Sequence, residues 1–227
     1  MFSQLVDQGI AVVIYVILVS SMAYGRPPRP ARVGPGSAPA GGSGGLRFDP
    51  TELLWIAALA ITALYPLGVL LFSENLRRFP FAVTFGGDEA FQIAGLVLVA
   101  AAGFLLATAF RALGRFATVR IEVSEEHRVV QNGPYAVIRH PMYTANILWT
   151  AGIALAFLST FLWVPVAAIV LLARMRARRE EQLFLRSPRL GGEYKAYFRS
   201  TGRFLPKRRR PSMGPPVDPG PPRNEVR

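Results

Sequence analysis

A polar stretch in the second half of the chain has the residue types and the spacing to bind a small charged ligand. Residues 122–143 carry both histidines of the protein and lie between two strongly apolar segments. His140 precedes Pro141, so its backbone should be extended, and a helix should begin at Pro141. The N–H groups of that first turn have no partner within the helix and could hold a carboxylate or another polar acceptor. The simpler alternative, that this loop only introduces a helix, stays open.

A second group of polar residues lies farther along the chain. Arg176 and Glu180 are four residues apart and therefore share one face of a helix. Arg178 and Arg179 point elsewhere, and Glu181 sits beside Glu180. The pair is the second candidate constellation for chemistry. The alternative is a solvated helix end whose charges pair with each other, worth roughly 0.2–0.5 kcal/mol.

Long apolar runs indicate that a bilayer surrounds the elements that carry these residues. Residues 53–72 and 93–110 each match the ~20 residues that cross a hydrocarbon core, and neither shows a polar stripe at the helical period. Pro66 should kink the first of these helices, which membrane helices tolerate. Residues 9–24 form a shorter run. A cleaved signal peptide is the alternative there, but residues 1–7 lack Lys and Arg, so we expect a retained helix.

The last apolar region, residues 143–173, is broken near Ser159, Thr160 and Pro165. Its 31 residues give about 46 Å of helix, whereas two crossings need about 60 Å. It is therefore either a helical hairpin that stops short or two helices that project beyond the membrane. Together the runs predict an all-α integral membrane protein with about five transmembrane helices and a C-terminal helical hairpin. Residues 194–206 form an amphipathic piece expected to lie on the membrane surface.

The distribution of arginine predicts the orientation. The chain has a formal net charge of +12, and arginines concentrate after the first helix, after the third helix and after the hairpin. The positive-inside rule places these segments in the cytoplasm, with the N-terminus outside and the C-terminus cytoplasmic. The basic cluster at residues 207–210 should lie against anionic membrane lipids rather than nucleic acid.

Composition then divides the chain. We expect a first transmembrane helix in residues 1–25, a disordered cytoplasmic linker rich in Gly and Pro in residues 26–50, and transmembrane helices two and three in residues 51–112. Residues 113–206 hold the motifs and the membrane hairpin, and residues 207–227 form a basic disordered tail. With no cysteine and two histidines, the sequence excludes disulfides and thiolate nucleophiles and predicts no metal site.

Several short motifs in residues 113–206 together resemble a known family. They are His127-Arg128-Val129-Val130, Gly133-Pro134-Tyr135, Arg139-His140-Pro141-Met142-Tyr143, Arg176 with Glu180-Glu181, Glu193-Tyr194 with Tyr197, and Arg203-Phe204-Leu205-Pro206. In this order they resemble the isoprenylcysteine carboxyl methyltransferase family. That family consists of integral membrane enzymes that use S-adenosyl-L-methionine and are related to phospholipid methyltransferases. The first half of the chain is similar to the family only in having membrane helices.

The resemblance implies roles for individual residues. A cytoplasmic cofactor-binding loop would place the following residues around S-adenosyl-L-methionine: His127, Arg128, Val129, Val130, Tyr135, His140, Pro141, Met142, Tyr143 and Glu180. Arg176 would bind the methyl acceptor, and Arg176 and Glu180 would be the catalytic pair. Upstream of His127, where the family often has an amide side chain, this chain has Thr118-Val119-Arg120.

Three functions remain open at this point. The first is methyl transfer to a lipophilic acceptor that enters from the bilayer, most simply a carboxylate of the prenylcysteine type, which is already ionised and needs no base. The second is N-methylation of a phospholipid amine or S-methylation of a small thiol. An amine acceptor needs a base near Arg176, for which Glu180, Glu181 and the tyrosines are candidates. The third is a non-catalytic membrane scaffold, against which the presence of Arg176, Glu180 and His140 weighs.

Overall fold

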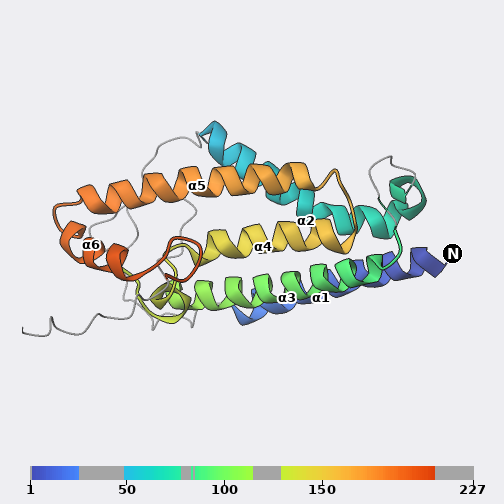
Figure 1. Ribbon diagram of the computed structural model, residues 1–227, viewed down its shortest axis with the longest axis horizontal. Helices are drawn as coiled ribbons and strands as arrows, with labels where there is room; N and C mark the ends of the chain where they lie inside the picture. The colour runs from blue at the N-terminus through green and yellow to red at the C-terminus, as the bar shows by residue number, and fades with distance from the viewer. Residues whose placement is uncertain (1, 26–48, 78–82, 84, 115–128, 208–227) are drawn as a thin grey trace, which may run out of the picture.

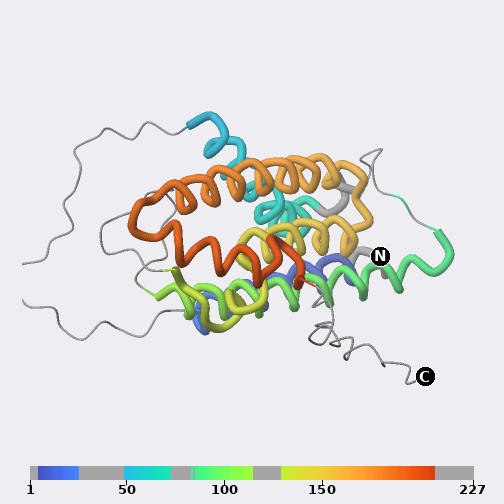
Figure 2. Tube along the Cα trace, turned by 60° about the vertical axis from the view of Figure 1, so that its left-hand side comes forward, coloured from blue at the N-terminus to red at the C-terminus, as the bar shows by residue number. Residues whose placement is uncertain are grey.

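The computed structural model describes residues 2–25, 49–77, 83, 85–114 and 129–207. Over these ranges the chain forms α1 (Phe2–Tyr24), α2 (Pro50–Arg77), α3 (Asp88–Leu113), the short 3-10 helix η2 (Gly133–Ala136), α4 (Pro141–Ala156), α5 (Trp163–Arg186) and α6 (Gly191–Ser200). The five long helices lie along one axis of an elongated bundle, and α6 folds back beside the far end of α5 (Figures 1 and 2). The predicted all-helical class is confirmed for the described residues.

Three helices are long and apolar enough to cross a membrane. They contain Leu5–Tyr24, Pro50–Phe72 and Asp88–Leu113, which correspond to the first three predicted spans. Large apolar side chains on these helices, such as Leu64, Val97 and Phe104, are exposed on the bundle surface. An apolar outer surface of this kind is what a lipid-facing helix requires. The chain is therefore a membrane protein with three such helices among the described residues, and the count of five stays a prediction.

The predicted hairpin is confirmed as α4 and α5. α4 begins at Pro141, as the His-Pro pair predicted, but the His140 backbone, with φ −125° and ψ 61°, is not fully extended. Leu158 turns the chain with a positive φ of 50°, and α5 starts at Trp163. With 16 residues α4 is about 24 Å long, shorter than the ~30 Å hydrocarbon core. α5 is longer, but its second half is charged and extends past the start of α4 (Figure 1).

The break in α2 lies at a different residue from the one predicted. In α2 the helical dihedral angles break at Phe72, with φ −133° and ψ 37°, rather than at Pro66. Pro66 is fully buried among neighbouring helices. Packing around a buried proline can therefore hold the helix together where hydrogen bonding alone would let it break.

α3 and α4 approach each other closely at a pair of glycines. A Cβ added at Gly95 would lie 2.6 Å from the carbonyl oxygen of Gly152, and one added at Gly152 would lie 2.8 Å from the carbonyl oxygen of Gly95. Glycines at helix crossings allow backbones to meet without intervening side chains, which is a common device in membrane bundles. The contact fixes α4 against α3.

A separate apolar cluster joins α2 to α5. Trp55 and Ala58 of α2 pack with Ile169, Leu172 and Ala173 of α5, and Tyr143 and Phe204 cover this cluster. The cluster lies directly beside the polar half of α5. It therefore brings a helix from the first half of the chain, which carries none of the motifs, to the residues predicted to do chemistry.

Candidate active site

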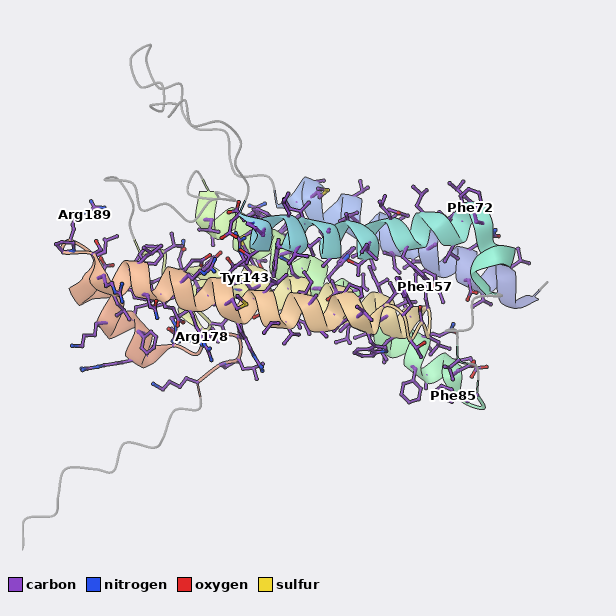
Figure 3. All side chains as sticks on the ribbon, turned by 90° about the horizontal axis from the view of Figure 1, so that it is seen from above. Phe72, Phe85, Tyr143, Phe157, Arg178 and Arg189 are labelled. Carbon is purple, nitrogen blue, oxygen red and sulfur yellow. The ribbon has the colours of Figure 1, made fainter. Side chains whose placement is uncertain are left out.

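The predicted site residues meet where α4 begins and where the polar half of α5 lies. Figure 3 shows Tyr143 and Arg178 toward this end of the bundle, and Phe72 and Phe157 at the opposite end. Their arrangement depends on four segments of the chain: the start of α2, the turn into α4, the second half of α5 and the segment after α6.

The segment after α6 is bound to the turn before α4 by main-chain hydrogen bonds. The N–H of Arg139 donates to the carbonyl of Gly202 at 2.8 Å, and the N–H of His140 donates to the carbonyl of Arg203 at 3.1 Å. Ile138 and Gly202 form a parallel bridge. This short pairing fixes the backbone on which His140 is held.

Glu181 is the centre of a buried charge cluster. Arg139 Nε donates to Glu181 at 3.0 Å, His140 Nε2 lies 3.3 Å from the same oxygen, and the Arg203 guanidinium donates to both carboxylate oxygens. The Glu181 side chain is only 4% exposed. One carboxylate thus accepts hydrogen bonds from two arginines and lies beside one imidazole, joining α5 to both paired segments.

Glu180 contacts a different set of groups although it is the next residue. Its carboxylate accepts a hydrogen bond from the Tyr143 hydroxyl, and His140 Nδ1 lies 3.4 Å from its second oxygen. The Glu180 side chain is 21% exposed, so one side of the carboxylate remains open to a ligand. His140 therefore lies between two adjacent carboxylates and stacks on the Tyr143 ring at 5.6 Å.

Arg176 is linked to Glu180 through the side chain of Tyr143. Its Nε donates to the Tyr143 hydroxyl at 3.4 Å, so one hydroxyl links Arg176 to Glu180. The guanidinium lies 5.8 Å from the centre of the Trp55 ring and 4.0 Å from the Glu52 carboxylate, both on α2. The expected sharing of a helix face is confirmed, and the Tyr143 hydroxyl links the two residues.

The electrostatics follow from this packing. Burial alone would lower the pKa of His140, but hydrogen bonds and charge from Glu180 and Glu181 outweigh it and raise the pKa above its usual value. Burial would raise the pKa of Glu181, yet hydrogen bonds from His140, Arg203 and Arg139 lower it to about 2. The pKa of Arg203 is raised by its hydrogen bond to Glu181. The cluster therefore favours a charged histidine beside a charged carboxylate.

Most of the predicted cofactor residues lie near this cluster. Tyr135 is buried, and its carbonyl accepts a hydrogen bond from the Tyr197 hydroxyl at 2.7 Å. Pro141 is fully buried, and Met142 is partly buried in the first turn of α4. Val129 and Val130 are partly buried at the start of the segment that leads to η2. His127 and Arg128 lie outside the described residues.

Four residues around the site were not among the predicted site residues. Glu181, Arg139 and Arg203 form the buried charge cluster, and Glu52 approaches Arg176 from α2. A signal for the first three was present, because two arginines inside apolar motifs require a carboxylate partner once buried. No motif pointed to Glu52.

Two tyrosines of the amphipathic segment pack inside the protein. Tyr194 and Tyr197 of α6 are buried in the protein, and Tyr194 stacks on Phe184 of α5 at 5.0 Å between ring centres. These aromatic faces are thus used for internal packing, and only the remaining surface of α6 is available to a membrane. The placement of residues 194–206 on the membrane surface stays a prediction.

Comparison with known proteins agrees with the motifs. Residues 90–187 match the family model described as phospholipid methyltransferase. Two curated rice proteins, from Oryza sativa subsp. indica and subsp. japonica, are each described as "Probable protein-S-isoprenylcysteine O-methyltransferase". Each is 31% identical over 116 residues, which cover 49% of this chain and 59% of the relative. The chain spans about three fifths of the length of these curated relatives.

The matched region resembles membrane methyltransferases, and the described residues include three helices long and apolar enough to cross a membrane. Over these residues the chain is similar to phospholipid and isoprenylcysteine methyltransferases. The family resemblance predicted from the motifs is confirmed.

Proposed function

We propose that the protein transfers a methyl group from S-adenosyl-L-methionine to a lipophilic acceptor, most simply a carboxylate of the prenylcysteine type. The observation that carries the proposal is the row Glu180, Tyr143 and Arg176, in which one tyrosine hydroxyl connects a partly exposed carboxylate to a buried guanidinium. A carboxylate and an arginine side by side offer separate places for a cationic donor and an anionic acceptor.

The chemistry of the described residues fits the donor. S-Adenosyl-L-methionine supplies a methyl group on a positively charged sulfur. Glu180 would accept hydrogen bonds from its hydroxyl or amino groups, since it is the partly exposed member of an otherwise buried set. His140 and Tyr143 hold the Glu180 carboxylate in place from two sides. His127 and Arg128 are proposed to complete this site on the basis of the family motif.

On the acceptor side, the chain contributes orientation and exclusion of water. Arg176 would hold the acceptor carboxylate in its planar fork, which sets the direction of the attacking oxygen. Trp55 packs edge to face against Tyr143 at 5.3 Å and closes the site on the α2 side. The apolar cluster of α2 and α5 would contact the lipid part of the acceptor.

Transfer of a labelled methyl group tests this function. The purified protein, with methyl-labelled S-adenosyl-L-methionine, should label N-acetyl-S-farnesylcysteine, and mild base should release the label because methyl esters are base-labile. Label that resists base, or label found only in other lipids of a total extract, would contradict the carboxylate acceptor.

A second candidate, N-methylation of a phospholipid amine, is favoured by one observation. Glu52 lies 4.0 Å from Arg176 and is a carboxylate that could take the proton which an ammonium must lose. In the labelling experiment this activity would place base-stable label in phosphatidylethanolamine. S-Methylation of a small thiol has no comparable group in its favour.

We further propose that the N-terminus is outside and that the polar end of α5 faces the cytoplasm and its anionic lipids. Because the chain lacks cysteine, single cysteines can be introduced at Gly86 and Gly192, where an added Cβ meets nothing within 4 Å. An impermeant thiol reagent should label the first variant in intact cells and the second only after lysis. The reverse pattern would overturn this orientation.

A further inference from the structure

We propose that Glu52 of α2 belongs to the acceptor site, where it serves as the counter-ion of Arg176 until an acceptor carboxylate takes its place. The inference rests on the proposed function and adds a residue from the half of the chain that carries no motif. It also assigns the acceptor site to the seam between α2 and α5.

The first argument is the burial of Arg176. Its side chain is 7% exposed and lies among α2, α4 and α5. A guanidinium cannot lose its charge in a protein, and a buried charge requires an opposite charge nearby. Tyr143 offers a hydroxyl and Trp55 an aromatic face, but each is neutral. Glu52 brings a carboxylate to 4.0 Å from the guanidinium, and Glu180 shares the Tyr143 hydroxyl with Arg176.

The second argument is the looseness of the contact. Glu52 Oε1 lies 4.0 Å from Arg176 Nη1, which is beyond hydrogen-bond length, so the attraction between the two is purely electrostatic. The Glu52 side chain is 20% exposed and sits in the first turn of α2. A carboxylate in the first turn of a helix remains stabilised by the helix dipole when it swings toward water. Glu52 can therefore leave Arg176 without losing all of its stabilisation.

A neighbouring ion pair on the protein surface provides a comparison for the contact between Glu52 and Arg176. Asp49, which precedes α2, and Arg179 of α5 pair at 3.0 Å, with side chains 47% and 49% exposed. That pair is shorter but solvated, so it is worth little to stability or binding. The longer pair is the one in the buried row of the proposed site.

The consequence concerns the charge of the acceptor. An incoming carboxylate meets repulsion from Glu52 and must displace it to reach Arg176, whereas an uncharged analogue has no such competitor. Removing the charge of Glu52 should therefore strengthen carboxylate binding selectively. Glu52 is in this sense a specificity-determining residue, because it sets the charge balance that the acceptor has to restore.

Equilibrium binding tests the proposal without turnover. The full-length protein in detergent, saturated with S-adenosylhomocysteine, is titrated with S-farnesylthioacetic acid and with its primary amide. Glu52→Gln should bind the acid about tenfold more tightly than the wild type and the amide equally well. Glu52→Asp, which keeps the charge, should bind the acid within about twofold of the wild type. The matched control Asp49→Asn, at the exposed pair, should change neither affinity.

The outcomes separate this inference from the proposed function. Unchanged or weaker binding of the acid to Glu52→Gln overturns the role of Glu52, as does an equal change for acid and amide, which would indicate a packing effect. Tighter binding of a prenyl amine to the wild type than to Glu52→Gln, with no gain for the acid, overturns it in favour of an amine site. If the acid binds as expected but no methyl group is transferred, the proposed reaction fails while the assignment of Glu52 stands.

Discussion

Glu180 and Glu181 are consecutive residues on α5, yet they belong to two different environments. Glu181 is 4% exposed and is held by Arg139, His140 and Arg203. Glu180 is 21% exposed and is held by a tyrosine hydroxyl and the other nitrogen of His140. The first carboxylate has its interactions satisfied within the protein, whereas the second keeps an open side. We infer that Glu181 holds the segments of the site together and that Glu180 contacts the bound ligand.

The most severe test of this difference is Glu181→Ala. It leaves the buried Arg139 and His140, and the partly exposed Arg203, without this carboxylate, and removing one partner of a buried ion pair typically costs about 3–5 kcal/mol. We expect a large loss of unfolding free energy, measured by chemical denaturation in detergent. Glu180→Ala should cost much less in the same measurement. Equal losses for the two variants would show that the carboxylates have equivalent structural roles.

Arg176→Ala should act on turnover rather than on the donor. An acceptor that is no longer aligned loses its proximity advantage, and a misplacement of about 1 Å can cost roughly a hundredfold in rate. We expect kcat/KM for the acceptor to fall by at least that factor, with affinity for the donor nearly unchanged. Arg176→Lys should recover little, because a point charge cannot reproduce the planar fork. Near-normal turnover in either variant would remove Arg176 from the acceptor site.

Glu180→Ala should show the opposite pattern. Loss of a hydrogen bond to a charged group costs about 1.5–3 kcal/mol, so donor affinity measured without acceptor should fall roughly ten- to a hundredfold. Glu180→Gln should fall between the wild type and Glu180→Ala. Isothermal titration with S-adenosylhomocysteine provides the measurement. An unchanged affinity would mean that the exposed side of Glu180 faces something other than the donor.

The smallest expected effect is the pH dependence of stability. The pKa of His140 is raised on folding, so its contribution is complete below its unfolded pKa near 6.5 and is lost as the pH rises through the folded value. The pKa of Glu181 is lowered from 4.5 to about 2, so its contribution is complete above 4.5 and is lost as the pH falls toward 2. Stability should therefore be greatest between about pH 4.5 and 6.5, as measured by melting temperature. His140→Gln should abolish the alkaline decline, and a decline that persists would assign it to another group.

Local patterns were sufficient for some parts of the molecule. The start of α4 follows from His140 and Pro141 because a proline at the first helical position has no N–H to lose. The shared face of Arg176 and Glu180 follows from helical periodicity alone. The three long apolar helices follow from hydropathy, since a span needs only length and composition.

The remaining features depend on contacts between distant parts of the chain. Glu181 differs from Glu180 by one step around the helix, and which of the two meets Arg203 depends on how the segment after α6 returns. Glu52 reaches Arg176 only because α2 packs on α5. Periodicity also could not predict the number of membrane crossings. α4 is short and half of α5 is charged, and neither property determines how deeply these two helices enter a bilayer.

Because α4 contacts α3 backbone to backbone at Gly152, a change at this contact would tilt α4 and displace its far end. Gly152 lies 12 residues from His140, which is about 18 Å along the helix axis. A tilt of about four degrees about this contact would move His140 by roughly 1 Å, the scale on which alignment of reacting groups is lost. The two backbones touch at this contact, so even an added methyl group at Gly95 would tilt α4 and shift His140 at its start. Residues that touch neither ligand can in this way tune the reaction through the angle of a single helix.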